Sequence, residues 1–561
     1  MKNVFIAVGG SGAKVAEALV RMLAIGFPTH KEKGLWTSAG DSLQIWRIDP
    51  DRSSGAAVSL QQCVQQYAEL QAHLNGGDTP GGVAGSSWAM SIDTRIRHLD
   101  PLQLPRATAT DNEQKTLRGI LDSGYGGKTS SQAILSSFYE AKDLEVEIDR
   151  GFYQKPFIGA AVMAIFADSL RNDNSPGGKE CNLTAFHNNQ ANFFLCGSLH
   201  GGTGACGVPV MGRFLGGRKN ANPAWGWRVG ACLLAPYCVP PQPPFNALKE
   251  GEFISEQEKD NLLQAHADDP AFAGLTTEQK RKLVDQILNG FFADPEAMEA
   301  RARQGLSYYK DHSADYFDEL YLVGKPEPDQ LKVWSNGGTS QSNPLNSAEV
   351  VGALTALNFY ASTNTGDPQS YIIGSVPDLI HSERLNLHEM PTYRIDDTDV
   401  DAEKIFLTTA VLVHLLKHQV PWDKRAKEWG KEIEGLRRLY QANEPRKEND
   451  RARYENAANL ITNFLMSTLD PRATIGWSGT DAARLWTYLS SEPSHVADVT
   501  ARMAKKFMSS EPKGALELGE SAIKLTTFDF GKWCPEGDQF SRGEYLRHVW
   551  SQLFSRCNDK L

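Results

Sequence analysis

The chain has 561 residues, of which 41% are hydrophobic and 22% are charged, and its formal net charge is -10. This length exceeds what one hydrophobic core usually organises, so we expect two or three domains. The composition excludes a disordered chain, and the acidic balance excludes an overall electrostatic footprint for nucleic acid or for an anionic membrane surface.

The eight cysteines form no C-x-x-C pair, which argues against a zinc knuckle and a thioredoxin motif. Cys196 and Cys232 lie in apolar runs, where free cysteine behaves as a small buried hydrophobe. Residues 1–25 lack the pattern of a signal peptide, and no apolar run approaches the roughly 20 residues that cross a bilayer. We therefore expect a cytoplasmic protein that makes no membrane contact.

The first elements predict an α/β nucleotide-binding unit. A β-rich apolar run over residues 4–8 is followed at once by Gly9-Gly10-Ser11-Gly12 and then by an amphipathic helical pattern. Strand, glycine turn and helix in this order open such a unit. A second strand is predicted over 43–48, ending in Asp49-Pro50-Asp51, and a helix over 56–75. Residues 76–110 are predicted to be rich in loops.

The middle of the chain continues this alternation. We expect a helix over 160–170, strands over 193–196, 227–234 and 317–323, a glycine-rich loop over 197–207 and a helix from 208. Residues 237–316, charged and helical after a proline-rich break, are interpreted as an insertion. Residues 348–360 are apolar on nearly every side, which predicts a buried central helix. The expected domains are a Rossmann-type nucleotide-binding domain over 1–360 and a C-terminal, largely helical α+β region over 361–561.

Three glycine-bearing turns each follow or border a predicted strand and open a helix. Backbone N–H groups at a helix N-terminus carry partial positive charge, and glycine lets a phosphate approach them closely. Such turns also occur without ligands, so one alone is weak evidence. Several in one chain predict that a single polyphosphate is held from several sides.

The most specific turn is Gly201-Gly202-Thr203-Gly204-Ala205-Cys206-Gly207. It resembles the signature loop of the tubulin and FtsZ superfamily, in which a GGTG run wraps the phosphates of GTP. Other segments are similar in the same order over about residues 1–390, and the chain looks most like the divergent bacterial members. The resemblance implies a GTP-binding or other nucleoside-triphosphate-binding protein, with Mg²⁺, that assembles with itself into filaments or oligomers.

The same resemblance implies roles for individual residues. Gly9 to Lys14 match the first phosphate loop, Asp49 and Asp51 the ribose or magnesium segment, and Lys155 to Gly159 the loop that faces the γ-phosphate. Asn346 and Glu349 match the helix turn that reads the base. The candidate nucleotide-binding residues are Gly9, Gly10, Ser11, Gly12, Ala13, Lys14, Asp49, Asp51, Pro156, Gly159, His200, Gly201, Gly202, Thr203, Gly204, Ala205, Asn346 and Glu349. For His200, a local hydrogen bond to the backbone is the competing role.

Hydrolysis in this superfamily is completed in trans by acidic residues of a loop after the central helix. The matching run here is residues 385–390, and its candidate catalytic residues are Asn386 and Glu389, with Asp367 upstream. His388 and Pro391 stand where the family has aspartates, so a weak or assembly-dependent GTPase is one expectation and an ordinary surface loop is the other.

Rival interpretations keep some support. A dinucleotide enzyme needs G-x-G-x-x-G, but the third glycine position is Val15, and Asp49 follows Gly12 by 37 positions rather than the usual 20 or so. A phosphate-loop NTPase is disfavoured because Asp122 occupies the position of the first glycine before Gly127-Lys128-Thr129. The alternatives to a polymerising protein are a nucleotide-bound switch or scaffold, whose insertion or C-terminal helices bind a partner protein, and an NAD-dependent oxidoreductase.

Overall fold

The computed structural model describes residues 2–24, 42–75, 95–99, 116–125, 137–149, 151–240, 254–265, 267, 276–288, 297–324, 328–331, 343, 345–361, 368–373, 387–389, 393–395, 398–400 and 474–475. Asp367, Asn386 and most of the C-terminal region predicted over 361–561 lie outside these residues.

The centre of the molecule is an eight-stranded sheet in the order β11-β10-β7-β5-β4-β1-β2-β3. Every neighbouring pair in it is parallel. Its strands are β1 (Lys2–Val8), β2 (Ser42–Ile48), β3 (Arg95–Leu99), β4 (Ala191–Ser198), β5 (Trp227–Leu234), β7 (Glu319–Val323), β10 (Gln369–Ile373) and β11 (Leu387–Glu389). The expected α/β class is therefore confirmed.

The inner strands are buried on both faces, as their unbroken apolar runs predict. All eight residues of β4 are buried, and in its register with β1 Phe194 lies opposite Phe5. The run β3-β2-β1-β4-β5-β7 has the order of a doubly wound sheet, in which the strand order reverses between β1 and β4. Ligands of such sheets bind outside the carboxyl ends of the strands at this reversal.

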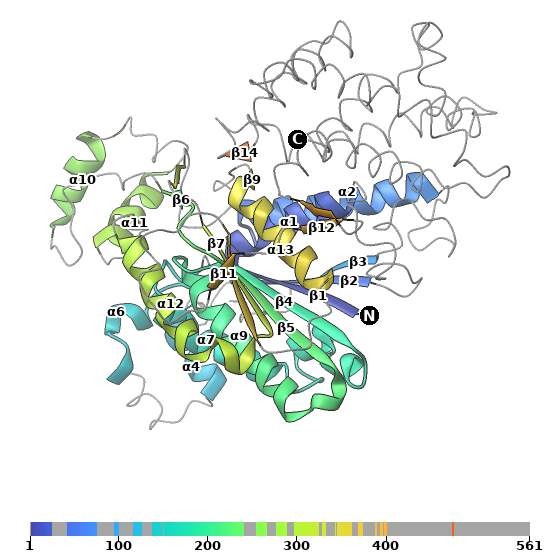
Figure 1. Cartoon of the computed structure of the whole chain (residues 1–561). Coiled ribbons are helices and arrows are strands. Elements are labelled where there is room, and N and C mark those ends of the chain that lie inside the picture. The colour runs from blue at the N-terminus through green and yellow to red at the C-terminus, as the bar shows by residue number, and fades with distance from the viewer. Residues whose placement is uncertain are drawn as a thin grey trace, which may run out of the picture.

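Helices cover both faces of the sheet (Figure 1). One layer contains α1 (Gly9–Ala24), α2 (Gly55–Asn75) and α13 (Ser347–Ala361), and α1 packs against both of the others. The other layer contains α4 (Leu117–Tyr125), α7 (Pro156–Ser169), α9 (Gly202–Ala221) and α12 (Ala297–Tyr316), with α9 packed against α7 and α12. Helix α13 is buried along most of its length, including Val350, Leu357 and Phe359 at 0% exposure.

The remaining elements are short or peripheral. They are α6 (Ala141–Leu144), α8 (Pro176–Cys181), η2 (Leu183–Phe186), η3 (Pro223–Trp225), β6 (Cys238–Val239), α10 (Glu256–Ala265), α11 (Thr277–Leu288), β8 (Asp329–Gln330), β9 (Leu345–Asn346), β12 (Tyr393–Ile395), β13 (Thr398–Val400) and β14 (Thr474–Ile475). Helices α10, α11 and α12 fall within residues 237–316. No helix in the described part of the chain has the length and apolarity to cross a bilayer.

Four local predictions are wrong. Helix α9 begins at Gly202, so Thr203, Gly204 and Ala205 form its first turn rather than a loop. Helices α1 and α7 likewise begin at Gly9 and Pro156, so residues 9–12 and 156–159 are the first turns of these helices rather than glycine loops. Glu389 lies on β11, paired with β10, and not in a loop. Strands β10 and β11 belong to this sheet, so the sheet crosses the domain boundary predicted at residue 360.

Candidate functional site

The glycine turns after β1 and β4 meet at the reversal of the sheet. Helix α1 starts at Gly9, directly after β1, and α9 starts at Gly202, four positions after β4 ends. A Cβ placed on Gly9, where φ is +75°, would lie 3.1 Å from the Cβ of Thr203. Two helix N-termini therefore stand side by side at the carboxyl edge of adjacent strands, which concentrates unpaired N–H groups at one place.

A third turn, residues 151–155 before α7, joins this junction. A Cβ on Gly202 would lie 2.8 Å from the carbonyl carbon of Phe152. Tyr153 and Gln154 both adopt positive φ, at 47° and 56°. Side chains disfavour this conformation, and such outliers cluster at functional sites. The structure thus brings together the three glycine-bearing turns that the sequence singled out; we call this place the loop junction. Pro156 and Gly159 lie on α7 rather than in the predicted loop, and a Cβ on Gly159 would lie 2.4 Å from Cys206 Sγ.

The glycines of the loop junction have different roles. A Cβ on Gly12 would lie 2.5 Å from the carbonyl oxygen of Cys196, and one on Gly204 would lie 2.6 Å from the nitrogen of Ser198. These two glycines allow close packing of helix on strand. Among the residues that the structure describes, a Cβ on Gly10 would meet only the Cβ of Ala56, at 4.0 Å. Of the glycines in the first turn of α1, Gly10 is the one that leaves space beside the helix N-terminus.

Asp49 and Asp51 follow β2, next to β1, and are 6% and 4% exposed. The backbone nitrogen of Asp51 donates to Asp49 Oδ1 at 3.2 Å, and that of Ser53 donates to Asp51 Oδ1 at 3.0 Å. Ser54 then caps α2 by accepting from the nitrogen of Ala57 at 3.2 Å. Both carboxylates therefore shape the turn that leads into α2, beside the open position at Gly10.

Glu349 is the centre of a buried polar network. Its Oε1 accepts from the Tyr237 hydroxyl at 2.7 Å, and its Oε2 accepts from the Asn346 nitrogen at 2.7 Å and lies 3.3 Å from Lys14 Nζ. The Tyr237 hydroxyl also lies 3.1 Å from Ser11 Oγ. Burial raises the pKa of Glu349, against the opposing effect of Lys14, Tyr237 and Asn346. The network joins the N-terminal part of α1 to the N-terminal part of α13, next to the loop junction.

This network changes the roles expected for three residues. Lys14 and Glu349 bind each other, and the Asn346 side chain donates to Asp329 at 2.8 Å and accepts from the nitrogen of Ala348 at 3.0 Å. In this structure their polar atoms therefore interact with other groups of the protein. Sequence analysis missed Tyr237, because this residue lies among apolar residues and prolines after β5 and belongs to no motif with a recognisable spacing.

The loop junction is also bordered by His200, which lies between β4 and α9, and by Arg301 of α12. His200 is 6% exposed, and its Nδ1 has no hydrogen-bond partner in the described structure. Burial, and secondarily the charge of Arg301, lowers its pKa to about 4, so the imidazole is neutral at pH 7. Arg301 comes from α12 and donates to Gln154 Oε1 at 2.6 Å. Sequence analysis missed Arg301 because it lies in the expected insertion, 101 positions along the chain from His200 (301 minus 200).

We expect the free energy of unfolding to depend on pH through the protonation of His200. Between pH 6.5 and about 4 the unfolded chain binds a proton at this histidine and the folded chain does not. Stability therefore falls as the pH is lowered through this window, by on the order of 3 kcal/mol for this group alone. Urea unfolding of wild type and His200→Gln between pH 4 and 7.5 should show a shallower pH slope for the variant. Parallel slopes would contradict the assignment.

The cavities described for this structure lie on the α7–α9 side of the sheet. One, of about 370 Å³, is lined by residues of α7, α9 and α12, with Ala205 on its wall. No cluster of three or more potential ligands among His, Cys, Asp and Glu is arranged for a metal ion in the described part of the chain. Magnesium in a nucleotide site does not require one, because it is bound through phosphates and one or two carboxylates.

Comparisons with protein-family models, with curated proteins and with solved structures found no match to this chain. No family is thereby shown, and function has to be inferred from the geometry of the chain itself.

Proposed function

We propose that this chain is a tubulin-like protein that binds a nucleoside triphosphate, GTP by preference, together with Mg²⁺ at the loop junction. The observation that carries the proposal is the meeting of the α1 and α9 N-termini with the turn before α7, at the reversal of a parallel sheet. Helix N-termini bind phosphates through free N–H groups and the helix dipole. The order of the three turns along the chain is the order that the family resemblance requires.

In this proposal the backbone of α1 at Gly10 and the first turn of α9 hold the phosphates, with the Thr203 hydroxyl as an added donor. Asp49 and Asp51 would contact the ribose or Mg²⁺, the role that the family resemblance implies for them. Because Lys14 is paired with Glu349, neutralisation of the phosphates falls to the amides, Mg²⁺ and Arg301. Asn346 and Glu349 reach a base only if they exchange their present partners.

Nucleotide-dependent self-association, with hydrolysis completed in trans, remains the proposed mode of action and rests on the family resemblance. A non-polymerising switch is the second candidate. It is favoured by α12, which packs on α9 and carries Arg301 to the loop junction. This contact links α12 to the proposed nucleotide. A dinucleotide enzyme is the third, favoured by the strand order and by Asp49 at the end of β2.

The test is sedimentation of the purified chain with Mg²⁺ and GTP, GDP, ATP, NAD or no nucleotide, with phosphate release followed in the same tubes. We expect GTP to bind and to drive the protein into the pellet. Binding of GTP without pelleting would favour the switch, and binding of NAD in preference to triphosphates would favour the oxidoreductase. If no nucleotide binds, the proposal is wrong.

A further inference from the structure

The pocket of about 370 Å³ on the α7–α9 side of the sheet lies between three helices, α7, α9 and α12. Each of these helices contributes one small residue to its lining, namely Ala160, Ala205 and Gly305. The aromatic residues of the lining are Phe157, Tyr308 and Tyr309. Pockets of this size with aromatic walls suit an aromatic group, which buries a large apolar area and packs well against other rings. We call this pocket the aromatic pocket.

An exposed phenylalanine lies close to the aromatic pocket on the same molecule. The Tyr139 ring stacks on the ring of Phe157, with 6.2 Å between their centres, and the Tyr139 hydroxyl donates to the Phe157 carbonyl oxygen at 3.2 Å. Phe138 directly precedes Tyr139, is 75% exposed and is not part of the pocket lining. Phe157 is itself 48% exposed. Exposed apolar side chains that gather at one place mark interaction sites.

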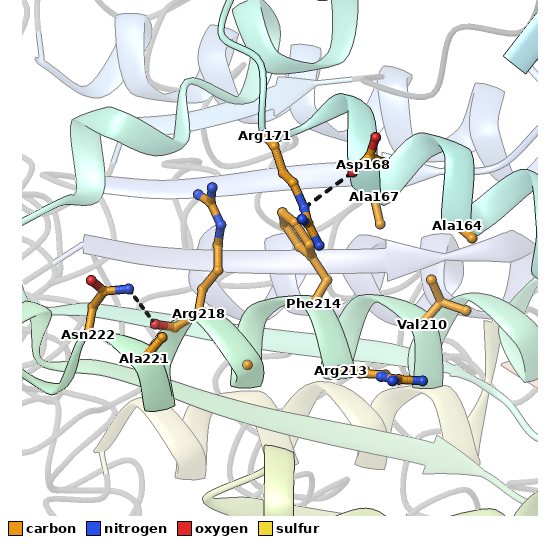
Figure 2. A pocket seen from close by; sticks show the side chains of 11 residues that line it. Ala164, Ala167, Asp168, Arg171, Val210, Arg213, Phe214, Arg218, Ala221 and Asn222 are labelled. Carbon is orange, nitrogen blue, oxygen red and sulfur yellow. Dashed lines mark hydrogen bonds and ion pairs between the residues drawn. The ribbon is translucent and has the colours of Figure 1, made fainter. Parts of the chain in front are cut away.

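The charges beside the pocket and beside Phe138 are of opposite sign. Arg213, an exposed residue of the pocket lining, forms no ion pair within the part of the chain that the structure describes. Figure 2, which views the neighbouring groove between α7 and α9, shows it near Val210. Glu140 follows Phe138 by two positions, and its ion pair with Lys142, at 3.4 Å, is exposed and therefore weak. A ring followed by a carboxylate thus matches a pocket that has a guanidinium in its lining.

A contact between two copies of the chain would use both features at once. In a two-fold interface the same patch of each copy faces the other, so every contact is made twice. We propose that two copies of this chain form a symmetric dimer, in which Phe138 of each copy enters the aromatic pocket of the other and Glu140 pairs with Arg213. The choice of a second copy rests on this self-complementarity and not on nucleotide binding. Because Ala205 lies in the first turn of α9, the interface would adjoin the loop junction.

Sedimentation velocity of the full-length protein without nucleotide tests the dimer. We expect a concentration-dependent equilibrium between monomer and dimer. Phe138→Ser should raise the dissociation constant at least about 100-fold, because two phenylalanine side chains lose their burial. Ala160→Leu fills the pocket with a good helix former and should weaken the dimer as well. Val58→Ser removes an exposed apolar side chain of α2, in the other helix layer, and is the matched control that should leave the equilibrium unchanged.

Charge reversal tests the proposed ion pair. Arg213→Glu and Glu140→Arg should each weaken the dimer, and the variant that carries both changes should recover most of the loss. The wild-type dimer should also weaken with salt. Circular dichroism checks that each variant is folded. Failure of the double reversal to restore association would count against the proposal.

A protein that stays monomeric at every concentration, or a dimer that Phe138→Ser leaves unchanged, would overturn the proposal. N-acetylphenylalaninamide is the competing probe: if a monomeric protein binds it saturably and Ala160→Leu abolishes the binding, the pocket receives an aromatic group of another molecule and the dimer is wrong. Affinity for Mg²⁺-GTP, measured on the same variants, should be unchanged. Loss of the dimer and loss of the nucleotide site are therefore separate outcomes.

Discussion

Replacing Gly10 by aspartate is expected to abolish triphosphate binding while the protein stays folded. The new side chain has room, because the nearest atom that another described element brings to a Cβ at this position is 4.0 Å away. It places a negative charge where the proposed phosphates approach α1, at a cost of about 4 kcal/mol for a pair of charges 4 Å apart at an effective dielectric constant near 20. We therefore expect the dissociation constant for GTP to rise at least about 100-fold.

The stability of Gly10→Asp should equal or slightly exceed that of wild type, because an acidic residue in the first turn of a helix interacts favourably with the dipole. Gly217→Asp is the matched control: it also faces open space, but near the other end of α9. Isothermal titration calorimetry with Mg²⁺-GTP measures the effect. Binding by Gly10→Asp at wild-type strength would place any nucleotide elsewhere than the loop junction.

Replacing Glu349 by alanine is expected to destabilise the fold by about 3–5 kcal/mol, the usual cost of removing one partner of a buried ion pair. The Glu349 side chain is 1% exposed and that of Lys14 is 15% exposed, so the lysine charge would lose its carboxylate in a place with little water. The Tyr237 hydroxyl and the Asn346 nitrogen would lose an acceptor in the same step. Urea unfolding, followed by tryptophan fluorescence, measures the loss.

A double-mutant cycle separates the ion pair from the rest of the network. Lys14→Met/Glu349→Leu replaces both charges by apolar groups, and we expect it to be more stable than Glu349→Ala. If the effects of Lys14→Met and Glu349→Leu simply add, the two side chains do not interact in the folded protein. GTP binding by the double variant would show in addition that Lys14 is not needed at the phosphates.

Much of the sheet and its flanking helices could be predicted from local pattern. The apolar runs at 4–8, 43–48 and 227–234 became β1, β2 and β5, because strands covered on both faces need an unbroken set of buried side chains. The all-round apolar run at 348–360 became the buried α13. The helix start at Gly202 was missed, because glycine is a poor helix former and only its contact with the turn before α7 shows why it begins the helix there.

The sequence by itself determined the α/β class and which glycine turns are candidates for phosphate binding, since both follow from residues close together in the chain. Only the tertiary structure decided that these turns meet, that Gly12 packs against β4 while Gly10 stays open, and that Lys14 is held by Glu349. It also brought Arg301 to His200. These relations join residues tens to hundreds of positions apart, and their partners are selected by the packing of helices on the sheet, which no local pattern records.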